Sequence, residues 1–221
     1  MRYLTSALIS EGVTDDQFLP RLLGRALTEL CCTEFDDPVE VADVQPLRDR
    51  KGPSGLPDVI RLVERNQASF SIIFFHHDQG TSIERVEDEW LRPLRRAWGE
   101  RPERLVTVVP VRETEAWLLA DGEGLRRALG VRWTDTAMGL PSHPKDVERI
   151  EDPKQVLNQV LARVSRSIGD HYGQLGELVS LDRLRLVPAY QKWWADTRKA
   201  LTDLGYRPAG GYPKQSGGSA R

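Results

Sequence analysis

Carboxylates follow three apolar stretches of this chain, and these positions are the best suited to chemistry. The stretches are Arg2 to Ser10, Phe70 to Phe75 and Leu105 to Val111, and the carboxylates that follow them are Glu11, Asp78, Glu113 and Glu115. Each stretch has the β-branched and aromatic content of a buried strand. Because the carboxyl ends of parallel strands meet at the ligand-binding edge of an α/β sheet, we expect these side chains to converge there.

A site built from oxygen ligands favours a hard cation. Mg²⁺ and Mn²⁺ commonly take one or two carboxylates together with waters and substrate phosphates. Such an ion activates water and stabilises an oxygen that leaves phosphorus. The sequence therefore predicts metal-assisted phosphodiester chemistry, with Glu11, Asp78 and Glu115 as catalytic metal ligands. Glu115 is preferred to Glu113 because it falls in the first turn of the next predicted helix, and residues two apart do not share a helix face.

Each candidate also has a plainer interpretation. Glu11 can be a polar turn residue, and Asp78 can cap the next helix, although Thr81 and Ser82 are also available as caps. A histidine beside a carboxylate, as His76 is, often only donates a hydrogen bond, and it can also contact phosphate. These alternatives stay open at the level of the sequence.

The elements expected around these residues alternate between strands and helices. Further strand character occurs at Val39 to Val44, and helical patterns cover residues 14–30, 56–66, 82–98, 153–168 and 188–204. Thr14 to Gln17 has the form of a capping box for the first helix, and Pro93 predicts a kink. We expect an α/β fold with a mostly parallel sheet of about four strands flanked by helices.

The chain is expected to form one domain with a helical extension. The α/β core covers residues 1–125, a helical extension that completes the domain covers 126–208, and a flexible Gly/Ser tail covers 209–221. Within the extension, residues 132–150 are rich in Pro, Gly, Ser and Asp, as in a long loop.

Composition limits the possible partners. The formal net charge of −2 gives no overall attraction to nucleic acid, so binding would need a local basic face. Candidate basic residues gather late in the chain, at Arg183, Arg185, Lys192, Arg198, Lys199, Arg207, Lys214 and Arg221. They suit a phosphate-tracking surface or the docking of an acidic partner. Lys154, expected at a helix start, either neutralises phosphate charge in the transition state or is a solvated lysine.

The two cysteines and the apolar segments indicate a cytoplasmic protein. Cys31 and Cys32 are adjacent, lack a CxxC partner and suit a reducing compartment as buried thiols. We expect no signal peptide and no membrane-spanning segment.

Two ordered motifs resemble the TOPRIM domain, the metal-binding module of topoisomerases, primases and OLD-family nucleases. They are Ile9-Ser-Glu-Gly-Val-Thr-Asp15, with its glutamate after the first strand, and the later strand that ends at Asp78. The resemblance implies a TOPRIM-like fold and a Mg²⁺-dependent nuclease, with Asp15 and His76 as further candidates. A complete Asp-x-Asp motif would need a second aspartate, but His76 and Gly80 occupy the two positions that could hold it. A two-metal site would therefore need His76 as the substitute ligand or a second ion held elsewhere.

A narrower resemblance extends over about residues 2–160. Glu11-Gly-x-Thr-Asp15, His76-x-Asp78, Pro110 to Asp121 and Asp152-Pro-Lys154 are similar to a TOPRIM-like family often encoded beside AAA-type ATPases in bacterial defence loci. This likeness implies a role in antiviral defence with nucleic acid, DNA in preference to RNA, and an ATPase as partners. It leaves two alternatives: a non-catalytic regulatory or nucleic-acid-binding subunit, and a primase-like or RNA-processing phosphoryl-transfer enzyme.

Overall fold

The computed structural model describes residues 1–48, 55–79, 82–98, 104–164 and 169–210. Residues 49–54, 80–81, 99–103 and 165–168 and residues 211–221 of the expected flexible tail lie outside these ranges. Ala209, which was placed in that tail, is described, and its N–H donates to the carbonyl oxygen of Glu34 at 2.9 Å. None of the helices within them has the length and hydropathy needed to cross a lipid bilayer.

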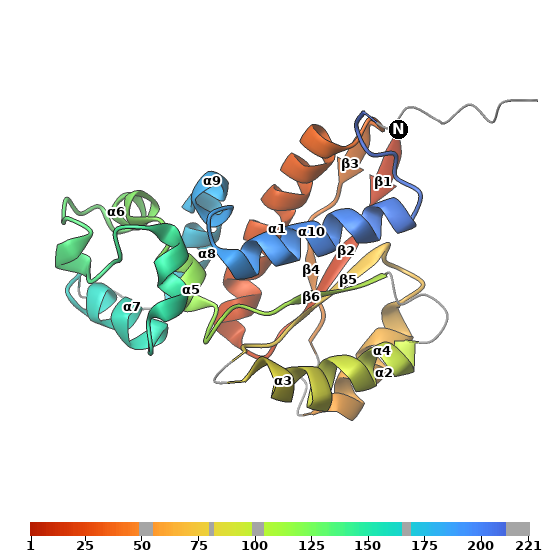
Figure 1. Cartoon of the computed structure of the whole chain (residues 1–221), viewed down its shortest axis with the longest axis horizontal. Coiled ribbons are helices and arrows are strands. Elements are labelled where there is room, and N and C mark those ends of the chain that lie inside the picture. Colours follow the sequence, from red (N-terminus) through yellow and green to blue (C-terminus); the bar gives the residue numbers. More distant parts are fainter. Residues whose placement is uncertain (49–54, 80–81, 99–103, 165–168, 211–221) are drawn as a thin grey trace, which may run out of the picture.

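A parallel sheet forms the centre of the molecule, as expected for the α/β class (Figure 1). Its strands lie in the order β4 (Gln45–Pro46), β2 (Ser6–Ile9), β5 (Ile72–His76) and β6 (Leu105–Val108). A two-stranded parallel sheet, β1 (Arg2–Leu4) with β3 (Val39–Val41), adjoins it. The single strand expected over Arg2 to Ser10 is thus divided at Thr5, whose carbonyl accepts a hydrogen bond from the N–H of Ser71 at 2.9 Å.

The register of the sheet aligns the carboxyl ends of β2, β5 and β6. Ile9 at the end of β2 lies opposite Phe75 of β5, and Phe75 lies opposite Thr107 of β6. Since all these strands run the same way, the residues just beyond them emerge at one edge.

Helices cover both faces of the sheet because its strands are apolar on both sides. The long helix α1 (Val13–Glu34) and the last helix α10 (Pro188–Asp203) pack on the face that carries Leu8 and Phe74. The other face, with Ile9 and Phe75, is covered by α2 (Leu56–Asn66) and by the continuous segment α3–η1–α4. In Figure 1 these two layers lie on opposite sides of the strands.

Helix α1 begins earlier than the sequence indicates, at Val13. The expected capping box from Thr14 to Gln17 is wrong: Gly12 is the N-cap, and the Asp15 carboxylate accepts a hydrogen bond from the Gly12 N–H at 3.0 Å. Asp15 occupies the third helical position, from which a carboxylate reaches back to the cap. Glu11 therefore lies in the short turn between β2 and α1.

The helix expected over residues 82–98 is continuous but contains a change of pitch. It consists of α3 (Ile83–Val86), a π-helical turn η1 (Glu87–Leu91) and α4 (Arg92–Trp98). The wider turn comes directly before Pro93, which has no N–H to donate to the preceding turn. Ser82 caps this segment by accepting the N–H of Arg85 at 3.3 Å, so Asp78 has no capping role.

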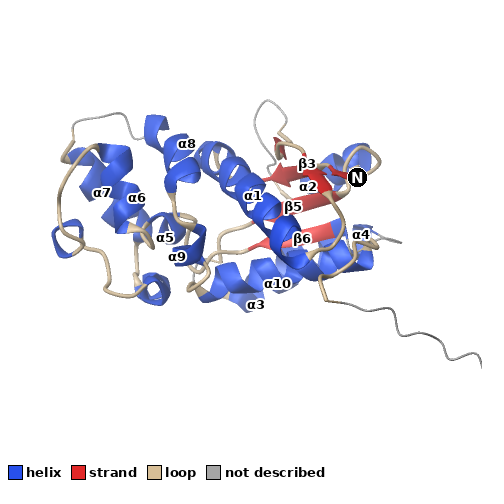
Figure 2. Ribbon diagram, turned by 90° about the horizontal axis from the view of Figure 1, so that it is seen from above, coloured by secondary structure: helices blue, strands red, loops and turns tan. Residues whose placement is uncertain are grey.

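The remaining helices form a second group beside the sheet (Figure 2). They are α5 (Glu115–Leu118), α6 (Gly122–Leu129), α7 (Pro153–Ala162), α8 (Gly169–Leu178) and α9 (Leu181–Leu184), with 3₁₀ turns η3 (Thr136–Met138) and η4 (Pro144–Arg149) in the expected loop. Helix α7 ends earlier than expected, and α6, α8 and α9 were not predicted. Helix α8 packs closely on α1 at Gly176. A Cβ at this position would lie only 2.6 Å from the carbonyl oxygen of Phe18, so the close approach requires glycine.

Candidate functional site at the carboxyl edge of the sheet

Glu11 and Asp78 lie next to each other at the carboxyl edge of the sheet. The backbone N–H of Asp78 donates to Oε2 of Glu11 at 3.2 Å, and Nε2 of His77 lies 3.2 Å from Oε1 of Glu11. The Glu11 side chain is 43% exposed and that of Asp78 is 28% exposed. The structure therefore places two carboxylates that are distant in sequence side by side and open to solvent.

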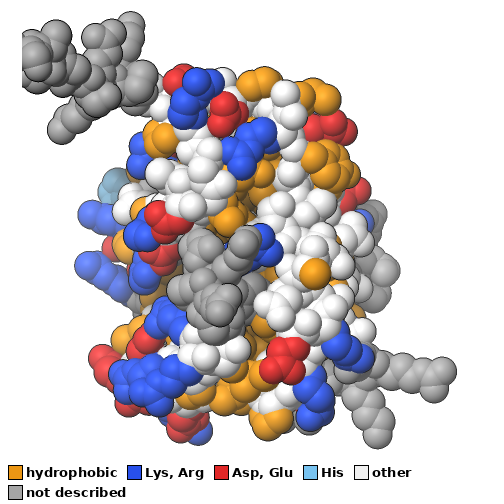
Figure 3. Space-filling model, turned by 90° about the vertical axis from the view of Figure 1, so that its right-hand side faces the viewer, with side chains coloured by type: hydrophobic (Ala, Val, Ile, Leu, Met, Phe, Trp, Pro, Cys, Tyr) orange, Lys and Arg blue, Asp and Glu red, His pale blue; other side chains and the backbone are white. Residues whose placement is uncertain are grey.

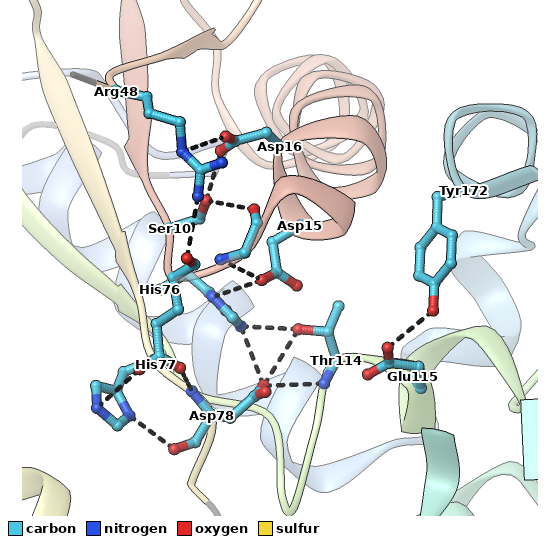
Figure 4. A network of polar contacts seen from close by, with 12 residues as sticks. Ser10, Asp15, Asp16, Arg48, His76, His77, Asp78, Thr114, Glu115 and Tyr172 are labelled. Carbon is cyan, nitrogen blue, oxygen red and sulfur yellow. Dashed lines mark hydrogen bonds and ion pairs between the residues drawn. The ribbon is translucent and has the colours of Figure 1, made fainter. Parts of the chain in front are cut away.

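The loop after β6 fixes the Asp78 carboxylate. Its Oδ1 accepts the backbone N–H of Thr114 at 3.0 Å and lies 3.3 Å from the Thr114 hydroxyl. Figure 4 shows these contacts and the Nε2 atom of His76, which lies 3.3 Å from the same oxygen. All three contacts are made by Oδ1 of Asp78, so a single oxygen anchors the carboxylate.

Thr114 is a site residue that sequence reasoning missed. Its side chain is buried, and its hydroxyl lies 2.7 Å from Nε2 of His76 as well as near Asp78. The available signal was its position between two carboxylates in the segment that joins β6 to α5, but a lone threonine has no motif of its own.

His76 is wholly buried between two carboxylates. Nδ1 lies 3.8 Å from Oδ2 of Asp15, on the side opposite the Asp78 contact. Burial by itself lowers the pKa of His76, but the hydrogen bond to Asp78 and the charge of Asp15 outweigh it and hold the pKa above its ordinary value. Burial in turn raises the pKa of Asp15, although His76 opposes the shift. His76 therefore orients Asp78, and its burial does not fit the expected contact with phosphate.

Glu115 lies in a different environment from the pair at the edge. Its side chain is only 3% exposed, and its Oε1 accepts the Tyr172 hydroxyl at 2.8 Å. The Glu115 carboxylate points toward Tyr172 rather than toward Asp78 (Figure 4). Burial and the negative charge of Glu115 raise the pKa of Tyr172, so the phenol keeps the proton that it donates. The expected convergence of Glu115 with Glu11 and Asp78 is not what the structure shows.

Lys154 lies in the first turn of α7 and contacts both Glu115 and Glu113. Its Nζ lies 3.5 Å from Oε1 of Glu115, and its backbone N–H donates to Oε2 of Glu113 at 3.1 Å. Burial lowers the Lys154 pKa but the carboxylates of Glu115 and Glu113 raise it more, so the ammonium stays charged. The pKa of Glu113 is raised by burial, against the hydrogen bond from Lys154. The Lys154 side chain is still 51% exposed, so its charge is accessible to a ligand.

Residues 113–115 thus connect the sheet edge to the helical extension. Glu113 binds the start of α7, Thr114 binds Asp78, and Glu115 binds Tyr172 of α8. One short segment sets the position of three separate parts of the molecule.

Arg48 follows β4 and has a structural role beside the turn that carries Glu11. Its Nη2 donates to the carbonyl oxygen of Glu11 at 3.0 Å, and its Nε lies 3.1 Å from Oδ2 of Asp16. The Ser10 hydroxyl donates to Oδ1 of the same aspartate at 2.5 Å. These contacts hold the turn that carries Glu11.

The basic residues late in the chain are paired with acids, so those described do not form a surface of one sign. The pairs are Arg185–Glu29, Arg198–Glu34, Arg207–Asp37, Lys192–Asp196 and Lys199–Asp203, while Arg183 donates to a backbone carbonyl. Figure 3 shows basic and acidic side chains interspersed on the face it presents. Lys214 and Arg221 lie outside the described residues. Three of these acids, Glu29, Glu34 and Asp37, lie in α1 or just after it and are far from the basic residues in sequence, which is why the sequence alone suggested an excess of positive charge.

Cys31 and Cys32 differ in their surroundings. Cys31 is buried, which raises its thiol pKa to about 11, but Cys32 is exposed, so the expectation of two buried thiols is wrong for Cys32. Adjacent helical residues point in different directions, so only one of them can face the core.

The donor set at the edge fits a hard cation in part. Glu11 and Asp78 supply two exposed carboxylates, a number that Mg²⁺ commonly takes together with water. Within the described ranges, however, no group of three or more His, Cys, Asp and Glu side chains is arranged to hold a metal ion. Comparisons of the chain with protein-family models, with curated proteins and with solved structures found no match.

Proposed function

We propose that this chain is a TOPRIM-like, Mg²⁺- or Mn²⁺-dependent nuclease whose site is the pair Glu11 and Asp78. The observation that carries the proposal is their contact at the carboxyl edge of a parallel sheet, where the Asp78 N–H donates to Glu11 at 3.2 Å. The ordered TOPRIM-like motifs in the sequence support it. When bound there, the ion would supply an activated water and neutralise charge that develops on the phosphate.

The protein's own residues perform the positioning. Thr114 and His76 hold Oδ1 of Asp78, and the other carboxylate oxygen would bind the ion. The Asp78 N–H binds the Glu11 carboxylate, and Arg48 binds the backbone carbonyl of Glu11 in the turn between β2 and α1. Such fixed ligands lower the cost of organising the site when substrate binds.

Lys154 supplies positive charge in this proposal. Glu115, originally expected as a third ligand, instead anchors Lys154 and Tyr172. The half-exposed ammonium would stabilise negative charge on the phosphate as the bond breaks.

The direct test is cleavage by the purified protein of plasmid, linear duplex and single-stranded DNA and of RNA, with Mg²⁺ or Mn²⁺. Glu11→Gln and Asp78→Asn should each abolish cleavage, and Glu123→Gln, at an exposed glutamate of α6, should leave it unchanged. Cleavage that persists in both site variants would reject the assignment.

A second candidate function is a non-catalytic regulatory or nucleic-acid-binding subunit of an AAA-type ATPase. It is favoured by the engagement of Glu115 with Tyr172 and Lys154, which leaves the edge with only two converging carboxylates. Stable copurification with the ATPase, no cleavage under any metal condition and no effect of Asp78→Asn on ATPase activity would select this candidate.

A further inference from the structure

The strand β6 is an open edge of the sheet. It is last in the strand order, and no other strand of the described residues lies against its outer side. The carbonyl of Val108 accepts the N–H of His77, and that of Pro110 accepts the N–H of Gln79. Because backbone groups alternate in direction along a strand, the N–H and C=O of Thr107 point outward.

The side chains of this edge strand do not block pairing. Leu105 to Val108 include no proline and no charged side chain, the residues that commonly blunt edge strands. A free edge of this kind is suited to accept another strand.

A groove runs along the edge between α4 and α10. A hollow of about 620 Å³ is floored by Leu105, Val106 and Thr107, with Arg95 of α4 on one wall and α10 on the other. It adjoins a second hollow of about 330 Å³, which shares Thr107 and is lined by Val111 and Pro188. Since Leu105 lies near the end of α10 and Val111 near its start, β6 and α10 run antiparallel.

The α10 wall of the groove carries a stripe of alternating charge. Lys192, Asp196, Lys199 and Asp203 all line it, at the spacing of one helix face. The signs invert about the midpoint of the stripe, between Thr197 and Arg198. An identical stripe laid antiparallel would place each lysine opposite an aspartate.

We propose that this edge is the interface between two copies of the chain. A two-fold axis at Thr107, normal to the sheet, joins β6 to the β6 strand of a second copy as an antiparallel pair and makes one continuous sheet. The same axis brings the two α10 helices together on one face, antiparallel, with their charge stripes matched. Such an interface is isologous, as in most symmetric dimers.

The charge pattern is what selects a second copy as the occupant. A groove wall with equal numbers of lysine and aspartate has no net sign, so it offers no general attraction to an acidic or a basic peptide. Its charges do match those of a second α10 helix that lies antiparallel to it, because each lysine then faces an aspartate. This inference does not depend on the proposed nuclease function.

The test uses two complementary charge variants of the full chain. Lys192→Glu with Lys199→Glu makes the stripe wholly acidic, and Asp196→Lys with Asp203→Lys makes it wholly basic. By sedimentation equilibrium, the wild type should dimerise, and each variant alone should have its dimer dissociation constant raised at least about tenfold. An equimolar mixture of the two variants should restore dimers, now mixed, as shown by tagging one of them.

A matched control separates interface effects from general loss of ion pairs. Arg85→Glu with Arg92→Glu removes two similar helical ion pairs on α3 and α4, outside the groove, and should leave the dimer intact. Circular dichroism of all variants checks that they fold.

A backbone variant tests the strand pairing itself. Thr107→Pro removes the outward N–H without removing a hydrogen bond to β5, and should give a folded monomer, whereas Thr107→Val should dimerise as the wild type does. A monomeric wild type, charge variants that dimerise alone, a mixture that stays monomeric or a dimeric Thr107→Pro would each overturn the proposal.

Discussion

The carboxylates after β5 and after β6 look alike in the sequence, but they lie in opposite environments. Asp78 is 28% exposed and is held through one oxygen by Thr114, beside an exposed Glu11. Glu115 is 3% exposed and is already engaged by Tyr172 and Lys154. A strand-end carboxylate can therefore serve a ligand or serve the fold, and only the groups packed around it decide which.

The largest effect is expected at the exposed pair. Asp78→Asn should lower metal-dependent cleavage by more than about 100-fold, beyond the range typical for groups that only orient a metal ligand. The free energy of unfolding should change little, because Asp78 is partly solvated. Cleavage assays and urea denaturation of the same preparation measure both. A large loss of stability together with a small loss of activity would make Asp78 structural.

Thr114 should show an intermediate effect, because it orients Asp78 without reaching solvent. Thr114→Val removes the hydroxyl near Asp78 and His76, and should lower metal affinity or activity by about 10- to 100-fold. Thr114→Ser keeps the hydroxyl and should recover most of the loss. Mn²⁺ titration followed by electron paramagnetic resonance gives the affinity of each variant. Equal behaviour of valine and serine would remove Thr114 from the site.

Glu115 should show the reverse balance, with stability affected more than metal binding. Glu115→Ala leaves the buried Tyr172 hydroxyl and Lys154 without their acceptor, at a cost of about 1–3 kcal/mol in the free energy of unfolding. Urea denaturation measures this cost, and Glu123→Ala at an exposed position is the control. Loss of Mn²⁺ binding without loss of stability would restore Glu115 as a ligand and contradict the contrast drawn between the two regions.

Lys154 is expected to give the smallest effect. Lys154→Met removes a half-exposed charge and should reduce the cleavage rate by about tenfold through weaker stabilisation of the phosphate, with metal affinity unchanged. Single-turnover cleavage at saturating metal isolates this step. An unaltered rate would leave Lys154 as a structural partner of Glu115 only.

Patterns of apolar residues were enough to predict three strands of the main sheet and the helices that cover it. The strand expected over Val39 to Val44 instead gives β3 of the smaller sheet, and the edge strand β4 (Gln45–Pro46) lies outside that range, because two residues are too few to form an apolar pattern. Helix α2 begins and ends at the expected residues, and the apolar face of α1 is buried as expected, because each pattern reports burial directly. The adjacency of Glu11 and Asp78 also followed from two strands that pair in parallel.

Long-range packing accounts for what the sequence did not indicate. The glycines of helix α8 weaken its helical pattern in the sequence, and Gly176 lies so close to α1 that a Cβ there would be 2.6 Å from the carbonyl oxygen of Phe18. Tyr172 is far from Glu115 in the chain, so nothing near Glu115 indicated that its carboxylate would be engaged. The same holds for Arg198, which pairs with Glu34 of α1.

Metal binding by the wild type and two variants tests the central claim most directly. Calorimetric titration with Mn²⁺ should show binding to the wild type and to Glu115→Gln, and no binding to Asp78→Asn. Binding that survives in Asp78→Asn but is lost in Glu115→Gln would contradict the assignment of the site to Glu11 and Asp78.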